Sequence, residues 1–331
     1  MQGLRTRFTW IVALVFCLSV AACAQTATAG NERLLVLNKA GNSLSVLNPD
    51  DFSLLGTVPV GEGPHEVVVS ADGTTAYVTN YGARTAGNSL SIIDIKSMKE
   101  TKRVDLGPLY RPHGIKLIGG KVYFSVEANN AIARYDPVAG KVDWIMGTGQ
   151  LGSHMVVATG DERYFYTPNI GSDTVTMISS GGPGRRPGID HIAVGRQPEA
   201  IDLSPDGKEV WVGLNLDQAI DVIDTATKKV TNRIKLSERP YRVVFAPDGK
   251  KAYATIFATK EVVEIDRSTK KILRTLTLEN RAFGITFTKN GQFAFVTTIQ
   301  EDGFVKIDLN SLKVVAKGTA GAGPDGIAVT F

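Results

Sequence analysis

A short sequence unit occurs seven times along this chain, and this repeat constrains the fold more than any other feature. Each unit begins with a three-residue anchor that usually starts with proline. The middle residues of the seven anchors are His65, His113, His154, Glu199, Tyr241, Phe283 and Asp325. Successive anchors lie 48, 41, 45, 42, 42 and 42 residues apart. A period in the low forties is typical of a four-stranded propeller blade.

Within one unit, strand-forming runs alternate with turn sequences. Residues 76–80 read Ala-Tyr-Val-Thr-Asn, and residues 88–94 alternate polar and apolar side chains, as a strand with two different faces does. Asp72-Gly73 precedes these runs, and Asp-Gly favours the primed two-residue turns of hairpins. No segment after the N-terminal region shows helical periodicity, so the sequence predicts an all-β fold.

The two ends of the repeat region predict how a ring would close. Residues 33–38 match the second strand of a unit, and no anchor precedes them. Residues 324–331 form an anchor strand that no unit follows. The two segments together complete one blade. We therefore expect a seven-bladed β-propeller of four-stranded antiparallel blades, in which residues 326–331 close the ring and remove its free sheet edges.

The same runs resemble a known repeat family. The segments 76–80 and 88–94, and likewise Ser204-Pro205-Asp206-Gly207 followed by residues 222–227, are similar to the YVTN-type β-propeller repeat of exported bacterial and archaeal proteins. The resemblance covers essentially the whole chain after its N-terminal region and implies a propeller fold. It does not imply one function, because relatives include surface-layer proteins, lactonase-like enzymes and binding proteins.

Residues 1–29 are predicted to be a secretory signal peptide ahead of a single propeller domain at residues 30–331. Arg5 and Arg7 precede an apolar run at residues 10–22, which is too short to span a membrane. Two processing routes fit this region. Residues 20–23 resemble the lipobox of bacterial lipoproteins, in which Cys23 would be acylated, whereas residues 22–24 and 27–29 fit ordinary signal peptidase. Both routes predict an exported protein, periplasmic or at the cell surface.

Composition restricts the partners. The only cysteines are Cys17 and Cys23, so the processed chain cannot form an internal disulfide. The net charge of +4 falls to +2 without Arg5 and Arg7, and no basic block interleaves with aromatic residues. Nucleic-acid binding is therefore not indicated. We expect a monomer that binds a small molecule or a protein and that contacts a membrane only through a lipid on Cys23.

The anchor residues are the leading candidates for a binding site. The strand order of a propeller brings them to the mouth of the central channel, which is concave and pre-formed. Three of the four histidines in the chain, His65, His113 and His154, occupy this position in adjacent units. Neutral imidazole binds transition metals, and Glu199 or Asp325 can add an oxygen ligand, so a divalent metal is a candidate cofactor. The alternative is that each histidine hydrogen-bonds within its own blade.

Further residues are expected around the same mouth. Arg111, Arg242 and Arg281 flank anchors and can meet a carboxylate or phosphate group of a ligand. Alternatively, they pair with Glu127, Glu199 or Glu301. The loops between second and third strands supply a predicted rim of Tyr81, Arg84, Glu127, Asn129, Asn169, Asn215, Lys260 and Glu301.

Repeated residues are poor candidates for catalysis, because one active site needs only one or two of them. Asp94, Asp136, Asp224, Asp266 and Asp308 follow the third strand in most units, and we expect them to cap the next turn. Glycine-flanked serine elbows, phosphate-binding loops and haem-attachment motifs are absent from the sequence. The leading interpretation is a non-catalytic binding or scaffold propeller outside the cytoplasm. The alternatives are a lactonase-like hydrolase acting at the channel mouth and a metal-dependent oxidoreductase that uses the three histidines.

Overall fold

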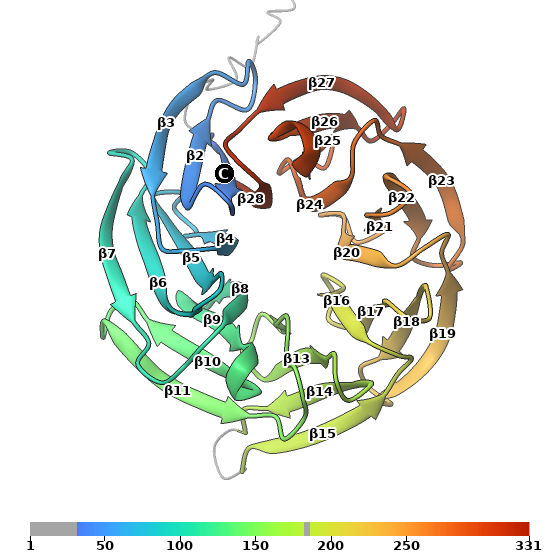
Figure 1. Cartoon of the computed structure of the whole chain (residues 1–331). Helices are drawn as coiled ribbons and strands as arrows, with labels where there is room; N and C mark the ends of the chain where they lie inside the picture. Colours follow the sequence, from blue (N-terminus) through green and yellow to red (C-terminus); the bar gives the residue numbers. More distant parts are fainter. Residues whose placement is uncertain (1–31, 182–185, 331) are drawn as a thin grey trace, which may run out of the picture. The chain divides into compact units, whose positions relative to one another are not determined.

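Seven four-stranded antiparallel sheets surround a central channel in the computed structural model (Figure 1). The chain divides into two units, residues 1–30 and 31–331, and the structure describes residues 32–181 and 186–330. The predicted seven-bladed β-propeller is therefore confirmed. The predicted signal peptide and Cys23 lie outside the described residues.

Each blade starts with its inner strand and ends with its outermost strand. Blade 1 contains β28 (Pro324–Val329), β1 (Leu34–Asn38), β2 (Ser43–Leu47) and β3 (Leu54–Pro59). Blade 2 contains β4 (Pro64–Val69), β5 (Thr75–Gly82), β6 (Ala86–Asp94) and β7 (Lys99–Asp105). Blade 3 contains β8 (Pro112–Ile118), β9 (Lys121–Val126), β10 (Ala131–Asp136) and β11 (Lys141–Gly147). Blade 4 contains β12 (Val157–Ala158), β13 (Tyr164–Asn169), β14 (Thr174–Ser179) and β15 (Gly188–Ala193).

The remaining three blades follow the same order. Blade 5 contains β16 (Pro198–Leu203), β17 (Glu209–Leu214), β18 (Ala219–Asp224) and β19 (Lys229–Lys235). Blade 6 contains β20 (Pro240–Phe245), β21 (Lys251–Ile256), β22 (Glu261–Asp266) and β23 (Ile272–Thr277). Blade 7 contains β24 (Ala282–Phe287), β25 (Phe293–Thr298), β26 (Gly303–Asp308) and β27 (Lys313–Thr319). The described helices are two single 3₁₀ turns, η1 (Glu127–Asn129) and η2 (Ile299–Glu301), and no helix in the described part is long and apolar enough to cross a bilayer.

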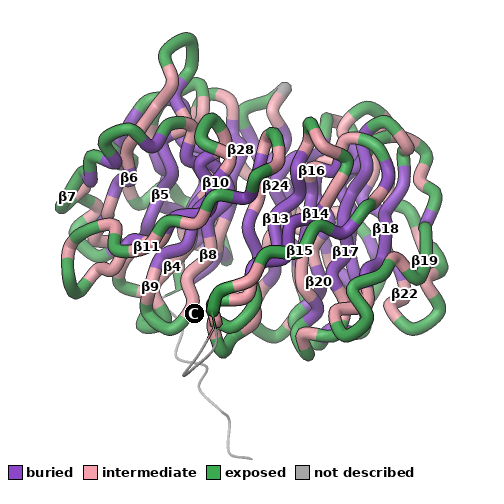
Figure 2. The backbone as a smooth tube through the Cα atoms, turned by 90° about the horizontal axis from the view of Figure 1, so that it is seen from below, coloured by how far each residue is buried: buried purple, intermediate pink, exposed green. Residues whose placement is uncertain are grey.

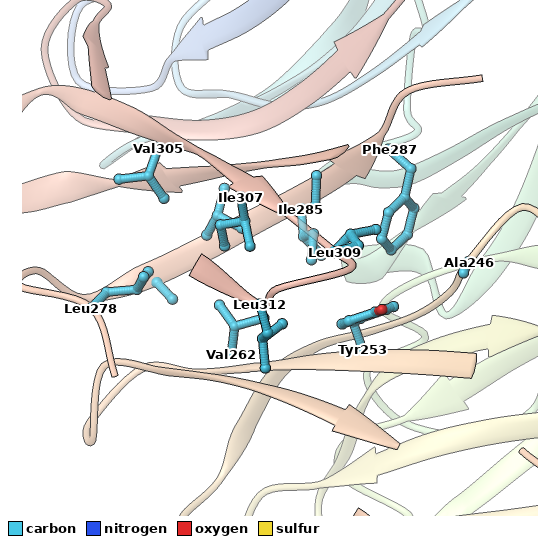
Figure 3. Close-up of a cluster of buried hydrophobic side chains, with 13 residues drawn as sticks. Ala246, Tyr253, Val262, Leu278, Ile285, Phe287, Val305, Ile307, Leu309 and Leu312 are labelled. Atoms are coloured by element: carbon cyan, nitrogen blue, oxygen red, sulfur yellow. The ribbon is translucent and has the colours of Figure 1, made fainter. Parts of the chain in front are cut away.

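The core consists of apolar side chains between neighbouring blades. Figure 3 shows one such cluster, in which Tyr253 and Val262 of blade 6 pack with Ile285, Phe287 and Ile307 of blade 7. Buried residues are concentrated on the inner three strands of each blade, whereas the outermost strands and the loops are largely exposed (Figure 2). The alternation of apolar and polar residues along the strands thus follows burial between blades.

The Asp-Gly turns differ from the expectation. The amide of Gly73 donates to the carbonyl of Ser70 at 2.9 Å, and only Gly73 of the pair has a positive φ, of 72°. A primed two-residue turn would need a positive φ at Asp72 as well. Glycine instead occupies the last position of a four-residue turn, a position at which type I turns favour it. The aspartates after the third strands do cap turns as expected, since Asp94 Oδ1 accepts from the Ser97 amide at 2.6 Å.

The ring closes by pairing β28 with β1. Leu34 faces Val329, and Val36 faces Ile327, in an antiparallel ladder. Beyond the ladder, the Arg33 amide donates to Thr330 Oγ1 at 2.7 Å. The predicted closure by the C-terminal strand is confirmed for the described residues up to 330.

We expect this closure to carry much of the stability. Ile327 is 9% exposed, so Ile327→Ala should lower the free energy of unfolding by about 2–5 kcal/mol. Ile272→Ala, on the outermost strand of blade 6, is the matched control and should change it by about 0.5 kcal/mol or less. Chemical denaturation measures both variants. A chain truncated after Gly323 that melts within a few degrees of the full chain would contradict the closure.

Candidate functional site

The seven anchor residues form one connected layer across the channel, which we call the anchor layer. In blade 2, Pro64 faces Asn80 whereas Val67 faces Val78, so the register shifts by one residue at the anchor. Corresponding shifts occur in blades 1, 3, 5, 6 and 7. A β-bulge of this kind changes the direction of a side chain. It occurs here in every inner strand except β12 of blade 4, which has only two residues.

Three imidazole rings lie in contact at the centre of this layer, in a row that we call the stack, with neighbouring planes tilted by 46° and 38°. The ring centroids of His65 and His113 are 3.9 Å apart, and those of His113 and His154 are 3.8 Å apart. All three residues are at most 8% exposed. The structure thus brings together the three histidines that the sequence singled out, whereas the fourth, His191, is exposed on the outermost strand β15.

His154 is held between two carboxylates from the neighbouring blades. Its Nδ1 lies 2.7 Å from Oε2 of Glu127, and its Nε2 lies 3.6 Å from Oε1 of Glu199. Burial lowers the pKa of His154, but hydrogen bonds to Glu127 and Glu199 outweigh it and raise the pKa to about 8. At neutral pH this ring therefore carries a proton on each nitrogen.

His65 is neutral in spite of a nearby carboxylate. Its Nε2 lies 2.7 Å from Nζ of Lys39, and its Nδ1 lies 3.1 Å from Oδ2 of Asp325 without the geometry of a hydrogen bond. Burial is the main reason that the pKa of His65 falls to about 3, and Lys39 lowers it further. The ring therefore accepts a hydrogen bond from the Lys39 ammonium.

His113, in the middle of the stack, has no hydrogen-bond partner for its Nδ1 among the described residues. The residue is 1% exposed, and burial holds its pKa well below the ordinary histidine value. It is a neutral imidazole packed between two other imidazoles. Native proteins rarely leave such a group unsatisfied.

The partners of the histidines correct one expectation. The sequence-based alternative was that each histidine hydrogen-bonds within its own blade. His65 instead contacts Lys39 and Asp325 of blade 1, and His154 contacts residues of blades 3 and 5. That alternative is wrong, because these side-chain partners of His65 and His154 all lie on neighbouring blades.

An ion pair crosses the channel beside the stack. The Arg242 guanidinium of blade 6 donates to Oε1 of Glu66 in blade 2 and lies 3.8 Å from Oδ1 of Asp325. The inner strands β4 and β20 face each other across the central opening (Figure 1). Burial raises the pKa of Glu66 despite this arginine. Asp325 also accepts a hydrogen bond of 3.1 Å from the Tyr241 hydroxyl.

Glu66 was not singled out from the sequence, although a signal was present. It is the third residue of its anchor, and the corresponding residues of the other units are Gly114, Met155, Ala200, Arg242, Gly284 and Gly326. A Cβ on Gly326 would lie 2.4 Å from the carbonyl oxygen of His65, so the inner strands touch at this position. The only charged residues there are of opposite sign, and they are the two that pair.

A second set of contacts, hydrogen bonds from hydroxyl groups to anchor carbonyls, is structural and was also not predicted from the sequence. Hydroxyl groups on second strands donate to the anchor carbonyl of the next blade, as Thr79 Oγ1 does to His113 at 2.8 Å. The equivalent donors are Ser125 to His154, Thr255 to Phe283 and Thr297 to Asp325. These bonds fix the backbone of the anchors relative to one another.

The channel is hollow next to the anchor layer. A cavity of about 410 Å³ follows the inner strands beyond the anchors, and Glu66, Lys116, Met155, Asp202 and Arg242 contribute to its wall. None of the seven anchor residues lines it. The cavity therefore lies beside the anchor layer, and Glu66, which follows His65 in the chain, lines the cavity.

The rim residues form aromatic and cationic contacts. The Arg111 guanidinium lies 4.7 Å from the ring centroid of Tyr81, whose hydroxyl donates to Glu127 at 2.9 Å. Arg281 lies 4.6 Å from the ring centroid of Phe257, which packs on the anchor Phe283. Neither arginine pairs with Glu127, Glu199 or Glu301, the partners considered from the sequence, in any contact of the described residues.

The other predicted rim residues have separate surroundings. Asn215 donates to Glu199, and Lys260 donates to the Glu279 carbonyl at 2.9 Å. Asn169 is buried against Ser153, and Asn129 receives the Tyr110 amide at 2.7 Å. Arg84 and Glu301 are exposed. Of the predicted rim, only Tyr81, Glu127 and Asn215 reach the anchor layer through these contacts.

Comparisons with known proteins identify the fold. No model of a known protein family matches the chain, and no curated protein matches its sequence. A protein of unknown function from Desulfotomaculum acetoxidans has a TM-score of 0.75 at 14% identity, over 90% of this chain and 98% of that one. A candidate 6-phosphogluconolactonase from Bacteroides uniformis has a TM-score of 0.73 at 12% identity, over 91% and 100%. Hydrazine synthase from Kuenenia stuttgartiensis has a TM-score of 0.69 at 18% identity, over 80% and 88%. At these identities the likeness concerns the propeller fold alone.

The cross-channel pair should behave as a coupled unit. Arg242 is 7% exposed, so Arg242→Met leaves Glu66 and Asp325 buried without their guanidinium and should cost about 3–5 kcal/mol of unfolding free energy. The double variant Arg242→Met with Glu66→Gln removes both charges and should recover a large part of that loss. Urea denaturation of the two single variants and the double variant measures the coupling. Additive losses would show that the two residues do not interact.

Proposed function

We propose that this protein is an extracytoplasmic propeller that binds a small ligand at the anchor layer and does not transform it. The observation that carries the proposal is the His113 ring, which is 1% exposed and whose Nδ1 has no partner among the described residues. A buried polar group without a hydrogen bond costs about 1–3 kcal/mol. A ligand that bonds this nitrogen would remove the cost.

The surroundings of His113 support a polar ligand of small size. Carboxylates, ammonium and guanidinium groups from five blades meet around the stack, and they are held by contacts between blades. Such a preorganised polar site binds without a large reorganisation of the protein. The adjoining cavity of about 410 Å³ provides space next to Glu66.

The hydrolase alternative has less support. A serine or threonine nucleophile requires a hydroxyl in hydrogen-bond contact with a base such as imidazole. Thr79 and Ser125 are the hydroxyl residues that contact His113 and His154, and both donate to backbone carbonyl oxygens. The oxidoreductase alternative depends on a bound metal.

Membership of the YVTN-type repeat family and export through residues 1–29 belong to the same proposal. Their support is the repeated sequence units and the composition of the N-terminal region. A protein outside the cytoplasm is exposed to metal ions and small solutes of the surrounding medium. We propose a monomer that binds a small solute or a protein partner, with no role in nucleic-acid binding.

Non-denaturing mass spectrometry of the full chain tests the ligand proposal. Protein purified from expressing bacteria should show a species heavier than the polypeptide measured under denaturing conditions. His113→Gln should lose this added mass, because it removes the unpartnered imidazole. His191→Gln, which changes an exposed histidine on β15, is the matched control and should keep it. Native and denatured masses that agree for the parent protein would refute the proposal.

Export and lipidation have a separate test. If Cys23 is acylated, cells that are fed labelled fatty acid should incorporate the label into the parent protein and not into Cys23→Ala. The variant should also leave the membrane fraction. A parent protein found wholly in the soluble extracytoplasmic fraction would decide for ordinary signal peptidase, and one found in the cytoplasm would refute export.

A further inference from the structure

We propose that His65, Glu66 and His113 form a binding site for one divalent first-row transition-metal ion, with its open coordination position on the channel side. The inference rests on the proposed binding function, because it names the class of the ligand. It differs from the sequence-based set of three histidines, because Glu66 takes the place of His154.

The geometry of the three side chains supports this assignment. One ligand atom from each of His65, Glu66 and His113 lies within 4.8 Å of the others. His65 and Glu66 are neighbours in the bulge of β4, and His113 occupies the bulge of β8. Two imidazoles and one carboxylate suit zinc, copper and iron, and three protein ligands leave a position for water or another ligand.

Two nitrogen atoms of this set make no hydrogen bond. Nδ1 of His65 and Nδ1 of His113 are buried and lack hydrogen-bond partners among the described residues, and the two residues are 6% and 1% exposed. A neutral imidazole keeps the lone pair that a metal ion requires.

His154 is unsuited to be the third ligand. Both of its nitrogens face carboxylates, Glu127 at 2.7 Å and Glu199 at 3.6 Å. Its role in the site is to cover the free face of His113, on which it stacks at 3.8 Å.

The carboxylates at the proposed site already have cationic partners. Glu66 accepts a hydrogen bond from the Arg242 guanidinium, and Oδ2 of Asp325 lies 3.4 Å from the Lys39 ammonium. Replacing the Arg242 contact of Glu66 by a metal ion leaves the guanidinium near Asp325, from which it is already 3.8 Å away.

Lys39 competes with the metal. Its ammonium donates to Nε2 of His65 at 2.7 Å, which places the single ring proton on Nδ1, the proposed ligand atom. Metal binding therefore requires that Lys39 withdraw and that this proton move to Nε2. The Lys39 side chain is 37% exposed and lies 3.4 Å from Asp325, so it has an alternative partner.

Titration of the metal-free full chain tests the site. Calorimetry with Zn²⁺ and visible absorption with Co²⁺ should each give one ion per chain. His65→Gln and His113→Gln should each weaken binding by more than the ~10–100-fold typical of outer-shell residues. Glu66→Gln should act likewise, and the double variant Glu66→Gln with Arg242→Met keeps the test valid if the single variant does not fold.

Lys39→Gln distinguishes a metal site from a purely structural role of these histidines. It removes a competing cation and frees His65, so it should tighten Zn²⁺ binding. Lys228→Gln is the matched control, because Lys228 forms an exposed ion pair of 2.8 Å with Asp190 far from the channel, and it should leave binding unchanged.

Several outcomes would overturn the inference. They are a parent chain that binds neither Zn²⁺ nor Co²⁺, a His113→Gln variant with undiminished binding, or an equal loss in His191→Gln. If the parent chain binds no metal but still carries a non-metal mass that His113→Gln loses, the metal site is refuted and the proposed binding function stands.

Discussion

The pairing of β28 with β1 is the interaction on which the rest of the structure depends. It joins residues almost 300 positions apart, as in the bond between Arg33 and Thr330, and it closes the row of blades into a ring in which β1 is paired on both sides. The same strand also delivers Asp325 to the channel, where this carboxylate contacts His65 and Tyr241. Closure of the fold and completion of the candidate site are therefore one event: a chain that fails to close lacks not only stability but also the anion that neutralises the cations of the anchor layer.

The anchor layer ties the blades together at a cost that apolar packing would avoid. Burying charged groups is expensive unless each is paired, and the layer meets this condition through partners drawn from different blades. Glu66 and Arg242 connect blades 2 and 6, and Glu127 and Glu199 hold His154 from both sides. Replacing a buried ion pair by apolar side chains of similar volume is often neutral or stabilising, and in blade 7 the apolar ring of Phe283 occupies the anchor position. The buried polar network costs free energy that apolar packing would not, and this cost points to a functional role for the anchor layer.

The repeat made the fold and the anchor positions predictable, because each unit must bury its two faces against neighbours and so repeats the residues that do this. The convergence of His65, His113 and His154 followed from strand order alone. The sequence placed Asp325, Glu199 and Glu127 at the same mouth but did not assign them to individual histidines, and it did not identify Lys39, because partners on other blades depend on how the side chains are directed. Glu66 was not predicted because it departs from the small residue that is usual at the third anchor position. Only a comparison of all seven units at that position reveals it together with Arg242. The turn at Asp72-Gly73 was misjudged because the dipeptide fits two turn types that differ in the φ of the aspartate.

Residues that recur in most blades of this ring are structural, whereas residues that depart from the repeat mark the candidate site. The hydroxyls of Thr79, Ser125, Thr255 and Thr297 occur in most blades, and each performs the same task of holding the next anchor carbonyl. A residue that does the same thing in most blades serves the ring as a whole, as the turn-capping aspartates also do. The anchors themselves occupy equivalent backbone positions but differ in chemistry: imidazoles gather in blades 2 to 4, carboxylates flank them, and aromatic rings fill blades 6 and 7. A symmetric scaffold thus carries an asymmetric site, and the asymmetry is greatest where Glu66 replaces a small residue beside two imidazoles whose Nδ1 atoms have no hydrogen-bond partner in the described part of the chain.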